Sequence, residues 1–166
     1  MRFVDFLKST VLLCAGSATL LAALTILGGS RTGEQVNTLI AVCWWAAAAV
    51  IGAWIGRHHA ASPPIARLLA DAKMQTALPE PRPALTLVNR LWPLLVVTVA
   101  AAALSFWLPQ VAGVAAGFAI IWSLAWRRQD AAVTAIEERD GFRFYVDRTP
   151  PLSPIRLIRT PGLMAG

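Results

Sequence analysis

The chain has 166 residues, of which 57% are hydrophobic and 14% are charged, and its mean hydropathy is +0.58. Soluble domains of this size are about 45–50% apolar and about 25% charged, and a small core leaves much of the chain's surface in water. The composition therefore excludes an ordinary soluble globular protein and predicts an all-α integral membrane protein. The two cysteines are too few for a disulfide framework.

Four apolar runs contain no Asp, Glu, Lys, Arg or His: residues 10–28, 37–56, 91–108 and 111–126. A helix of about 20 apolar residues crosses the roughly 30 Å of hydrocarbon in a bilayer. We therefore expect four transmembrane helices in two antiparallel hairpins, because the connections at 29–36 and 109–110 are short. The first run is longer than the apolar part of a secretory signal, so we interpret it as a span. Pro93 is expected in the first turn of the third helix, where its missing N–H costs little.

The distribution of the basic residues predicts an orientation. The net charge is +6, and Arg31 is the only Lys or Arg in the two short connections. All the other basic residues lie in segments 1–9, 57–90 and 127–166. Because Lys and Arg accumulate on the cytoplasmic side of a membrane, we expect a multi-pass protein of the cytoplasmic (inner) membrane with both termini in the cytoplasm.

The expected organisation has five parts: a cytoplasmic N-terminus (1–9), a first hairpin (10–56), a cytoplasmic loop (57–90), a second hairpin (91–126) and a cytoplasmic tail (127–166). In the loop, Ser62 and Pro63 begin a short amphipathic helix. In the tail, a helix ends at Gly141, and two extended pieces follow at 142–146 and 155–159. The extended pieces fit a β-hairpin and fit nearly as well an extended tail that docks on the bundle.

The tail also carries a resemblance to a family. Residues 135–146 (AIEERDGFRFYV) and 154–162 (PIRLIRTPG) resemble an uncharacterised family of small bacterial four-span membrane proteins. The hydrophobic part matches that family only in pattern. The resemblance implies the four-span architecture and brings no known activity, so it assigns no functional residue.

Glycines four residues apart occur in two of the spans. They are Gly52 and Gly56 in the second span, and Gly113 and Gly117 in the fourth. Small residues at this spacing let helix backbones approach closely, which matters because lipid gives helices no hydrophobic drive to associate. We interpret all four as helix-packing residues, and both packing within the chain and a seam for another subunit stay open. Trp44 and Trp45 lie deep in their span and are expected to pack between helices.

Residues with candidate chemistry are few. Cys14 and Cys43 lie at different depths of antiparallel spans, so we expect no disulfide and interpret both as small packing residues. His58 and His59 have no obvious third ligand for a metal. Three carboxylates gather in the tail and are expected to be solvated or paired with arginines: Glu137, Glu138 and Asp140. The sequence therefore predicts no catalytic residue, no cofactor and no metal, and hence no enzyme.

Four arginines form the most distinctive polar feature of the tail: Arg143, Arg148, Arg156 and Arg159. A basic group near an anionic leaflet contributes about 1 kcal/mol to membrane binding. We expect these side chains to contact anionic lipid headgroups on the cytoplasmic side or the acidic surface of a protein partner in the membrane. Nucleic acid is a less favoured partner, because basic charge is expected on a cytoplasmic face in any case.

The leading functional hypothesis is a non-catalytic accessory, assembly or scaffold subunit of a larger membrane complex. A small channel or transporter is the alternative, and it requires a homo-oligomer because one four-helix bundle encloses little space. Coupled pumps generally carry an ionisable residue within a span, and these runs have none. A membrane enzyme that acts on lipid is the weakest hypothesis, since no acid–base or metal constellation converges.

Overall fold

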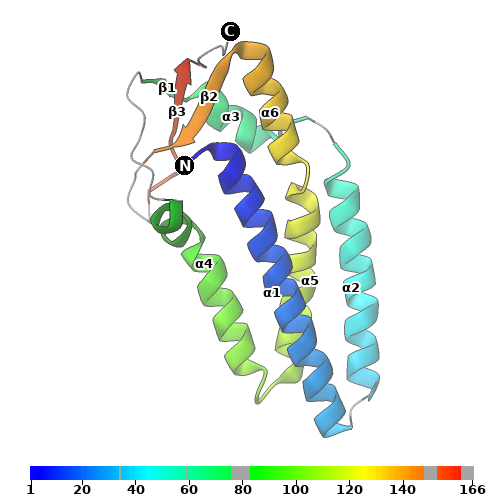
Figure 1. Ribbon diagram of the computed structural model, residues 1–166. Helices are drawn as coiled ribbons and strands as arrows, with labels where there is room; N and C mark the ends of the chain where they lie inside the picture. Colours follow the sequence, from blue (N-terminus) through cyan, green and yellow to red (C-terminus); the bar gives the residue numbers. More distant parts are fainter. Residues whose placement is uncertain (34, 59, 76–82, 148–152, 162–166) are drawn as a thin grey trace. The chain divides into compact units, whose positions relative to one another are not determined.

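The computed structural model describes residues 1–33, 35–58, 60–75, 83–147 and 153–161 (Figure 1). These residues are mostly helical. Their elements, in chain order, are α1 (Phe3–Thr32), α2 (Gln35–Ile55), α3 (Pro63–Ala70), β1 (Lys73–Met74), α4 (Pro83–Leu104), α5 (Pro109–Trp126), α6 (Gln129–Asp140), β2 (Phe142–Val146) and β3 (Leu157–Pro161).

The chain folds as two compact units. The helical unit comprises Thr10–Arg57 and Trp92–Arg127, and the mixed unit comprises Met1–Ser9, His58–Leu91 and Arg128–Gly166. Helices α1 and α4 each contribute their first residues to the mixed unit and the remainder to the helical unit. The mixed unit is therefore built from three segments that lie far apart in the sequence.

The helical unit contains the four long apolar helices that the sequence predicts. In length and composition, α1, α2, α4 and the helical stretch that starts with α5 are each sufficient to cross a membrane. Figure 1 shows that α1 and α2, and likewise α4 and α5, run in opposite directions from one short connection. The prediction of a mostly helical protein with four potential spans is confirmed.

The boundaries of the third helix differ from the prediction. Helix α4 begins at Pro83, so Pro93 lies inside the helix and not in its first turn. At that position proline removes a hydrogen bond from the helix interior and tends to kink it. The helix also ends at Leu104, four residues earlier than expected. Leu108, which precedes Pro109, has left the helical conformation (φ −132°, ψ 83°).

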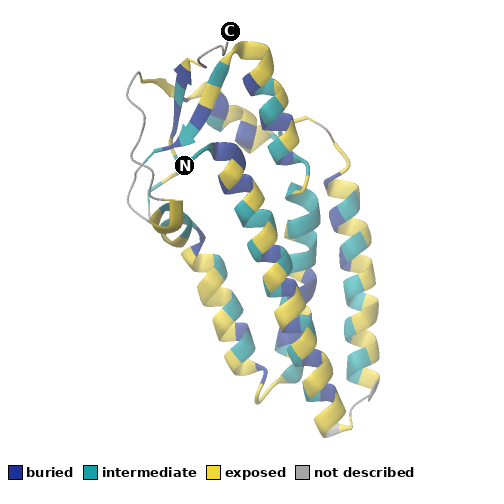
Figure 2. Ribbon diagram, in the orientation of Figure 1, coloured by how far each residue is buried: buried dark blue, intermediate teal, exposed yellow. Residues whose placement is uncertain are grey.

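The core of the helical unit is made of small side chains. Its buried cluster consists of Leu21, Ala101, Ala112 and Ala116. Large apolar side chains point outward in its helices; Leu12 in α1 and Val99 in α4, for example, are 71% and 67% exposed. Figure 2 shows exposed residues along the length of these helices. Such a surface is suited to lipid, which solvates apolar side chains as well as a protein interior does.

The mixed unit contains a three-stranded sheet in the order β1-β3-β2. Strand β2 pairs with β3 in antiparallel register, Phe142 opposite Pro161 and Val146 opposite Leu157, and β1 pairs with β3 in parallel. Gly141 ends α6 in the left-handed conformation (φ 68°) that glycine adopts without strain. The tail therefore forms a sheet, to which the loop at residues 57–90 adds the two-residue strand β1, which the sequence does not predict.

Large side chains fill the core of the mixed unit. Four of them are at most 2% exposed: Phe3 and Leu7 at the start of α1, Ile65 in α3 and Val133 in α6. The N-terminus also joins the sheet, since Arg2 forms a bridge with Tyr145 and the backbone N–H of Val146 donates to the carbonyl oxygen of Met1. The first residues of the chain are thus a structural part of this unit.

Candidate functional site

The closest helix contact of the helical unit is a seam between α2 and α5. Of the helix pairs, α2 and α5 share the most extensive contact. Gly113 faces Ala41, Gly117 faces Trp44, and Gly52 faces Ile121 and Leu124. Residue numbers increase together along both helices, so the second helices of the two hairpins pack in parallel.

All four of the predicted packing glycines lie on this seam. A Cβ atom at Gly52 would lie 2.9 Å from the Cβ of Leu124 and 3.0 Å from backbone atoms of Ile121. A Cβ at Gly56 would collide with the carbonyl oxygen of Leu124. At Gly113 a Cβ would lie 3.3 Å from side-chain atoms of Ala41 and Thr25. At each of these glycines the missing side chain lets the neighbouring helix approach closely, and the packing is within one chain.

Two tryptophans close the N-terminal half of the seam. The indole N–H of Trp44 donates to the carbonyl oxygen of Val114 at 3.2 Å, and that of Trp45 donates to the carbonyl oxygen of Gly113 at 2.8 Å. The ring of Trp44 covers Gly117, where a Cβ atom would collide with it, and meets Phe118 edge to face. These contacts satisfy the hydrogen-bond donors of both indoles.

Several hydroxyl groups of the helical unit bond to backbone carbonyl oxygens one turn earlier in the chain. Thr25 donates to the carbonyl oxygen of Leu21 at 2.8 Å, and Ser105 donates to that of Ala102 at 2.6 Å. Thr98 lies 2.8 Å from the carbonyl oxygen of Leu94 and 3.2 Å from Oγ of Ser17. These groups therefore offer little to a polar permeation pathway through a single chain.

A large apolar groove lies between α1, α4 and α5. Its volume is about 1020 Å³. The α1 wall includes Thr10, Cys14 and Leu21, and the α4 wall runs from Pro93 to Leu104. On α5 the lining extends from Gln110 through Val114 and Phe118 to Trp122 and Trp126. The sequence analysis did not anticipate this groove, because the loose packing of α4 has no signature in hydropathy.

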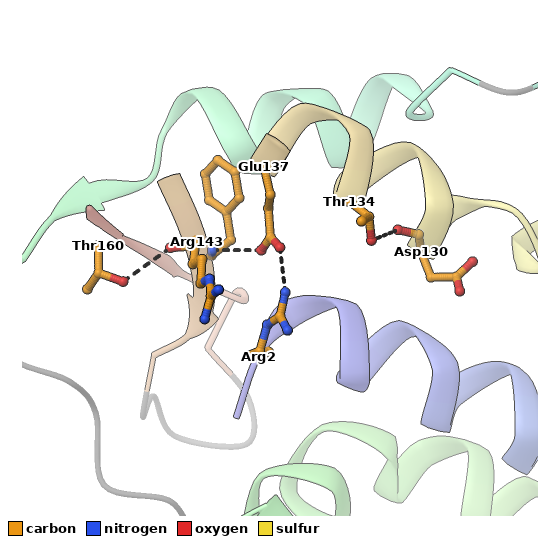
Figure 3. A network of polar contacts seen from close by, with 7 residues as sticks. Arg2, Asp130, Thr134, Glu137, Arg143 and Thr160 are labelled. Carbon is orange, nitrogen blue, oxygen red and sulfur yellow. Dashed lines mark hydrogen bonds and ion pairs between the residues drawn. The ribbon is translucent and has the colours of Figure 1, made fainter. Parts of the chain in front are cut away.

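A partly buried ion pair joins three elements of the mixed unit (Figure 3). Nη2 of Arg2 lies 2.8 Å from Oε2 of Glu137, and Oε1 of Glu137 accepts the backbone N–H of Phe144 at 2.9 Å. The side chain of Glu137 is only 5% exposed, whereas that of Arg2 is 39% exposed. The bond to Glu137 raises the pKa of the Arg2 guanidinium above its ordinary value. A single carboxylate therefore joins the N-terminus, α6 and β2.

This pair explains an unfavourable feature of the sequence. Carboxylates near a helix C-terminus oppose the helix dipole, so they were expected to be solvated or to find arginines. Glu137 forms an ion pair with Arg2, 135 residues away in the sequence. Asp140 forms an ion pair with its exposed neighbour Arg139, at 2.7 Å. The identity of the distant partner could not be read from the sequence.

The sheet separates the arginines of the tail. Arg143 and Arg156 are exposed, and Arg159 is half-buried with its guanidinium 5.7 Å from the centre of the Phe142 ring. Phe144 is paired with Arg159, and side chains alternate along a strand, so Arg143 and Arg159 lie on opposite faces of the sheet. Arg148 lies outside the described residues. The described arginines therefore do not form one continuous basic patch.

Residues with metal-binding or thiol chemistry are dispersed in the described part of the chain. No group of three or more His, Cys, Asp or Glu residues in that part is placed to hold a metal ion. His58 is described, but His59 lies outside the described residues. Both thiols are free; Cys14 is buried, and Cys43 is exposed. The burial of Cys14 agrees with its interpretation as a small packing residue, whereas the exposed Cys43 is not packed against the rest of the described chain.

Comparisons of the chain with protein-family models, with curated proteins and with solved structures find no match. The resemblance of the tail to small four-span proteins therefore brings no site to this chain. Any functional argument depends on the geometry of the α2–α5 seam, the apolar groove and the mixed unit.

Proposed function

We propose that this is a multi-pass protein of the cell inner membrane, with both termini and the mixed unit on the cytoplasmic side. Four apolar helices of sufficient length support the membrane location. The accumulation of Lys and Arg in segments 1–9, 57–90 and 127–166 supports the orientation, since Arg31 alone lies in the opposite connections. The five-part organisation predicted from the sequence follows from this orientation.

Within the membrane, the protein acts as a non-catalytic accessory, assembly or scaffold subunit of a larger complex. The observation that carries this proposal is the mixed unit, in which the N-terminus, the loop and the tail fold around one core of large side chains. A folded body of this kind offers a docking surface on the cytoplasmic side. Among the described residues it brings together structural contacts, such as Arg2 with Glu137, in place of a cluster suited to acid–base chemistry.

The exposed arginines supply the contact chemistry. Arg143 in β2 and Arg156 just before β3 are exposed and belong to the unit with the most basic residues. Their partners are anionic headgroups of the cytoplasmic leaflet or acidic side chains of a partner subunit. Liposome binding tests the lipid partner and protein capture tests the protein partner, so the two measurements distinguish these alternatives.

The channel alternative has less support. The hydroxyls of Thr25, Thr98 and Ser105 bond to backbone carbonyls of their own helices, and the one large groove described is almost wholly apolar. Conduction would require a pathway built between several copies of the chain. A membrane enzyme acting on lipid is less well supported still, since no described cluster suits its chemistry.

The decisive experiment is the native mass of the protein after gentle extraction from its own membrane, with the co-purifying chains identified. We expect a foreign chain in stoichiometric amount. The Arg143→Glu/Arg156→Glu variant should lower its recovery at least tenfold, whereas Arg67→Glu/Arg139→Glu, with the same charge change on exposed helical positions, should retain it. A mass made only of copies of this chain would overturn the accessory role.

A further inference from the structure

The walls of the apolar groove between α1, α4 and α5 differ in length. Its lining runs from Thr10 to Leu21 on α1 and from Pro93 to Leu104 on α4. At 1.5 Å per residue each of these two walls is about 16 Å long, which is about half of the roughly 30 Å of bilayer hydrocarbon. The α5 wall, from Gln110 to Trp126, is about 24 Å long. All three walls would therefore enclose a membrane-crossing helix over only about half of its length, whereas an acyl chain is narrow and flexible enough to lie between them.

The lining selects a hydrocarbon occupant. Ser17 and Thr98 are the polar groups in the middle of the groove, and they lie 3.2 Å from each other while Thr98 also bonds to its own backbone. Apart from the thiol of Cys14, the remaining lining between the ends is aliphatic or aromatic. The volume of about 1020 Å³ lies at the upper end of the range of small-molecule sites, about 300–1,000 Å³. Such a space can hold an acyl chain without leaving a polar group in the groove unpaired.

One end of the groove is suited to a headgroup. Trp122 and Trp126 line that end with ring centres 5.9 Å apart, and indoles favour the boundary between hydrocarbon and headgroups. The exposed Arg127 follows Trp126 directly in the helical unit. A guanidinium at this position offers an anionic phosphate both charge and hydrogen bonds.

We infer that this groove binds a membrane phospholipid with an anionic headgroup, one acyl chain lying along α1, α4 and α5 and the phosphate lying beside Arg127. The lipid fills the space that the loose contact of α4 leaves open, and so acts as a structural ligand of the helical unit. This inference rests on the proposed membrane insertion but not on the proposed accessory role.

The test counts lipids on the purified protein. We would extract the full chain in a mild detergent, add palmitoyl-oleoyl phosphatidylglycerol, and measure the bound phospholipids by native mass spectrometry. Val97→Trp places an indole in the groove, whereas Val99→Trp places the same side chain outside it on the same helix; the two valines are 62% and 67% exposed. We expect wild type and Val99→Trp to retain a tightly bound lipid and Val97→Trp to lose it at least tenfold.

A second variant and a charge control sharpen the test. Val114→Trp fills the groove from α5, so it should reproduce the loss even where Val97→Trp fails to fold, as judged by its thermal melting. Arg127→Gln should weaken phosphatidylglycerol binding about threefold at low salt and leave phosphatidylcholine binding unchanged, whereas Arg57→Gln, at the end of α2, should change neither.

Equal retention of lipid by wild type, Val97→Trp, Val99→Trp and Val114→Trp would overturn the inference. A loss of dimer mass in Val97→Trp with an unchanged lipid count would also overturn it, because a second copy of the chain would then be the occupant. Membrane insertion is checked separately by carbonate extraction. Recovery of the chain in the soluble fraction would refute insertion, whereas a failure of lipid binding alone would leave insertion and the accessory role standing.

Discussion

The two units place large apolar side chains in opposite positions. In the mixed unit, Phe3 and Ile65 are 2% and 1% exposed. In the helical unit, Ala112 and Ala116 are fully buried, whereas large residues such as Val36 face outward. Burying apolar area from water stabilises the mixed unit by roughly 25 cal/mol for each Å². Helices in lipid gain almost nothing this way, so small residues and close backbone packing must hold the helical unit together.

Helix α1 contains both arrangements of large apolar side chains, buried and outward-facing. Leu7 lies in the mixed unit and is completely buried, whereas Leu12 lies five residues further on in the helical unit and is 71% exposed. Figure 2 shows the dark-blue start of α1 giving way to a helix with exposed faces. The same residue type therefore has two roles within two turns of one helix, and a substitution at each position measures the difference.

The largest effect is expected from Leu7→Ala. Because the side chain is completely buried among the large residues of the mixed unit, truncation should lower the free energy of unfolding by about 3 kcal/mol. Leu12→Ala is the matched control on the same helix, and it should change the free energy by less than about 0.5 kcal/mol. Equilibrium unfolding in mixed detergent micelles measures both. Similar losses at the two positions would show that the two units share one packing regime.

The next largest effect is expected at the α2–α5 seam. In Gly56→Ala the new methyl group meets the backbone of Leu124 and Ala125, which yields less easily than a side chain. The variant should lose about 2–3 kcal/mol of stability through overpacking and should loosen the helical unit while the mixed unit stays folded.

Gly16→Ala is the control for this variant, because a Cβ at Gly16 meets no heavy atom within 4 Å. It is expected to be neutral or slightly stabilising, since alanine favours the helix over glycine by up to about 1 kcal/mol. Hydrogen exchange resolves the effect by unit. Equal behaviour of Gly56→Ala and Gly16→Ala would mean that close backbone approach contributes nothing to the seam.

Hydropathy predicted the helical unit because each helix satisfies its own backbone and needs only an apolar surface to lie in lipid. The four runs, the stop at Gly141 and the α3 start at Pro63 all depend on nearby residues. The glycine spacing indicated close packing but not the partner, since Gly113 and Gly52 lie in different hairpins. The parallel α2–α5 seam depends on tertiary contacts between distant segments, which no local sequence pattern predicts.

The mixed unit was harder to predict because its contacts join distant segments. Strand β1 has only two residues, Lys73 and Met74, and it exists because β3 offers a free edge to it. The first nine residues read as a cytoplasmic extension, yet Phe3 and Leu7 belong to the core. The start of α4 at Pro83 was also missed, since a search for uncharged runs stops at Arg90 although the helix continues through it.

The smallest of the three effects is expected at the ion pair of the mixed unit. Arg2→Leu leaves Glu137 buried without its cation and should lower the free energy of unfolding by about 2 kcal/mol. This loss is smaller than the roughly 3–5 kcal/mol for breaking a fully buried pair, because Arg2 is partly exposed. Glu137→Gln in the Arg2→Leu background removes the buried charge and keeps an acceptor for the Phe144 N–H, so it should restore most of the loss. A double-mutant cycle by equilibrium unfolding measures this coupling, and Arg139→Leu, at an exposed pair, should cause no measurable change. Additive losses would mean that Glu137 is held by the Phe144 N–H alone. In that case the N-terminus would be attached to the mixed unit by the apolar contacts of Phe3 and Leu7 and not by charge.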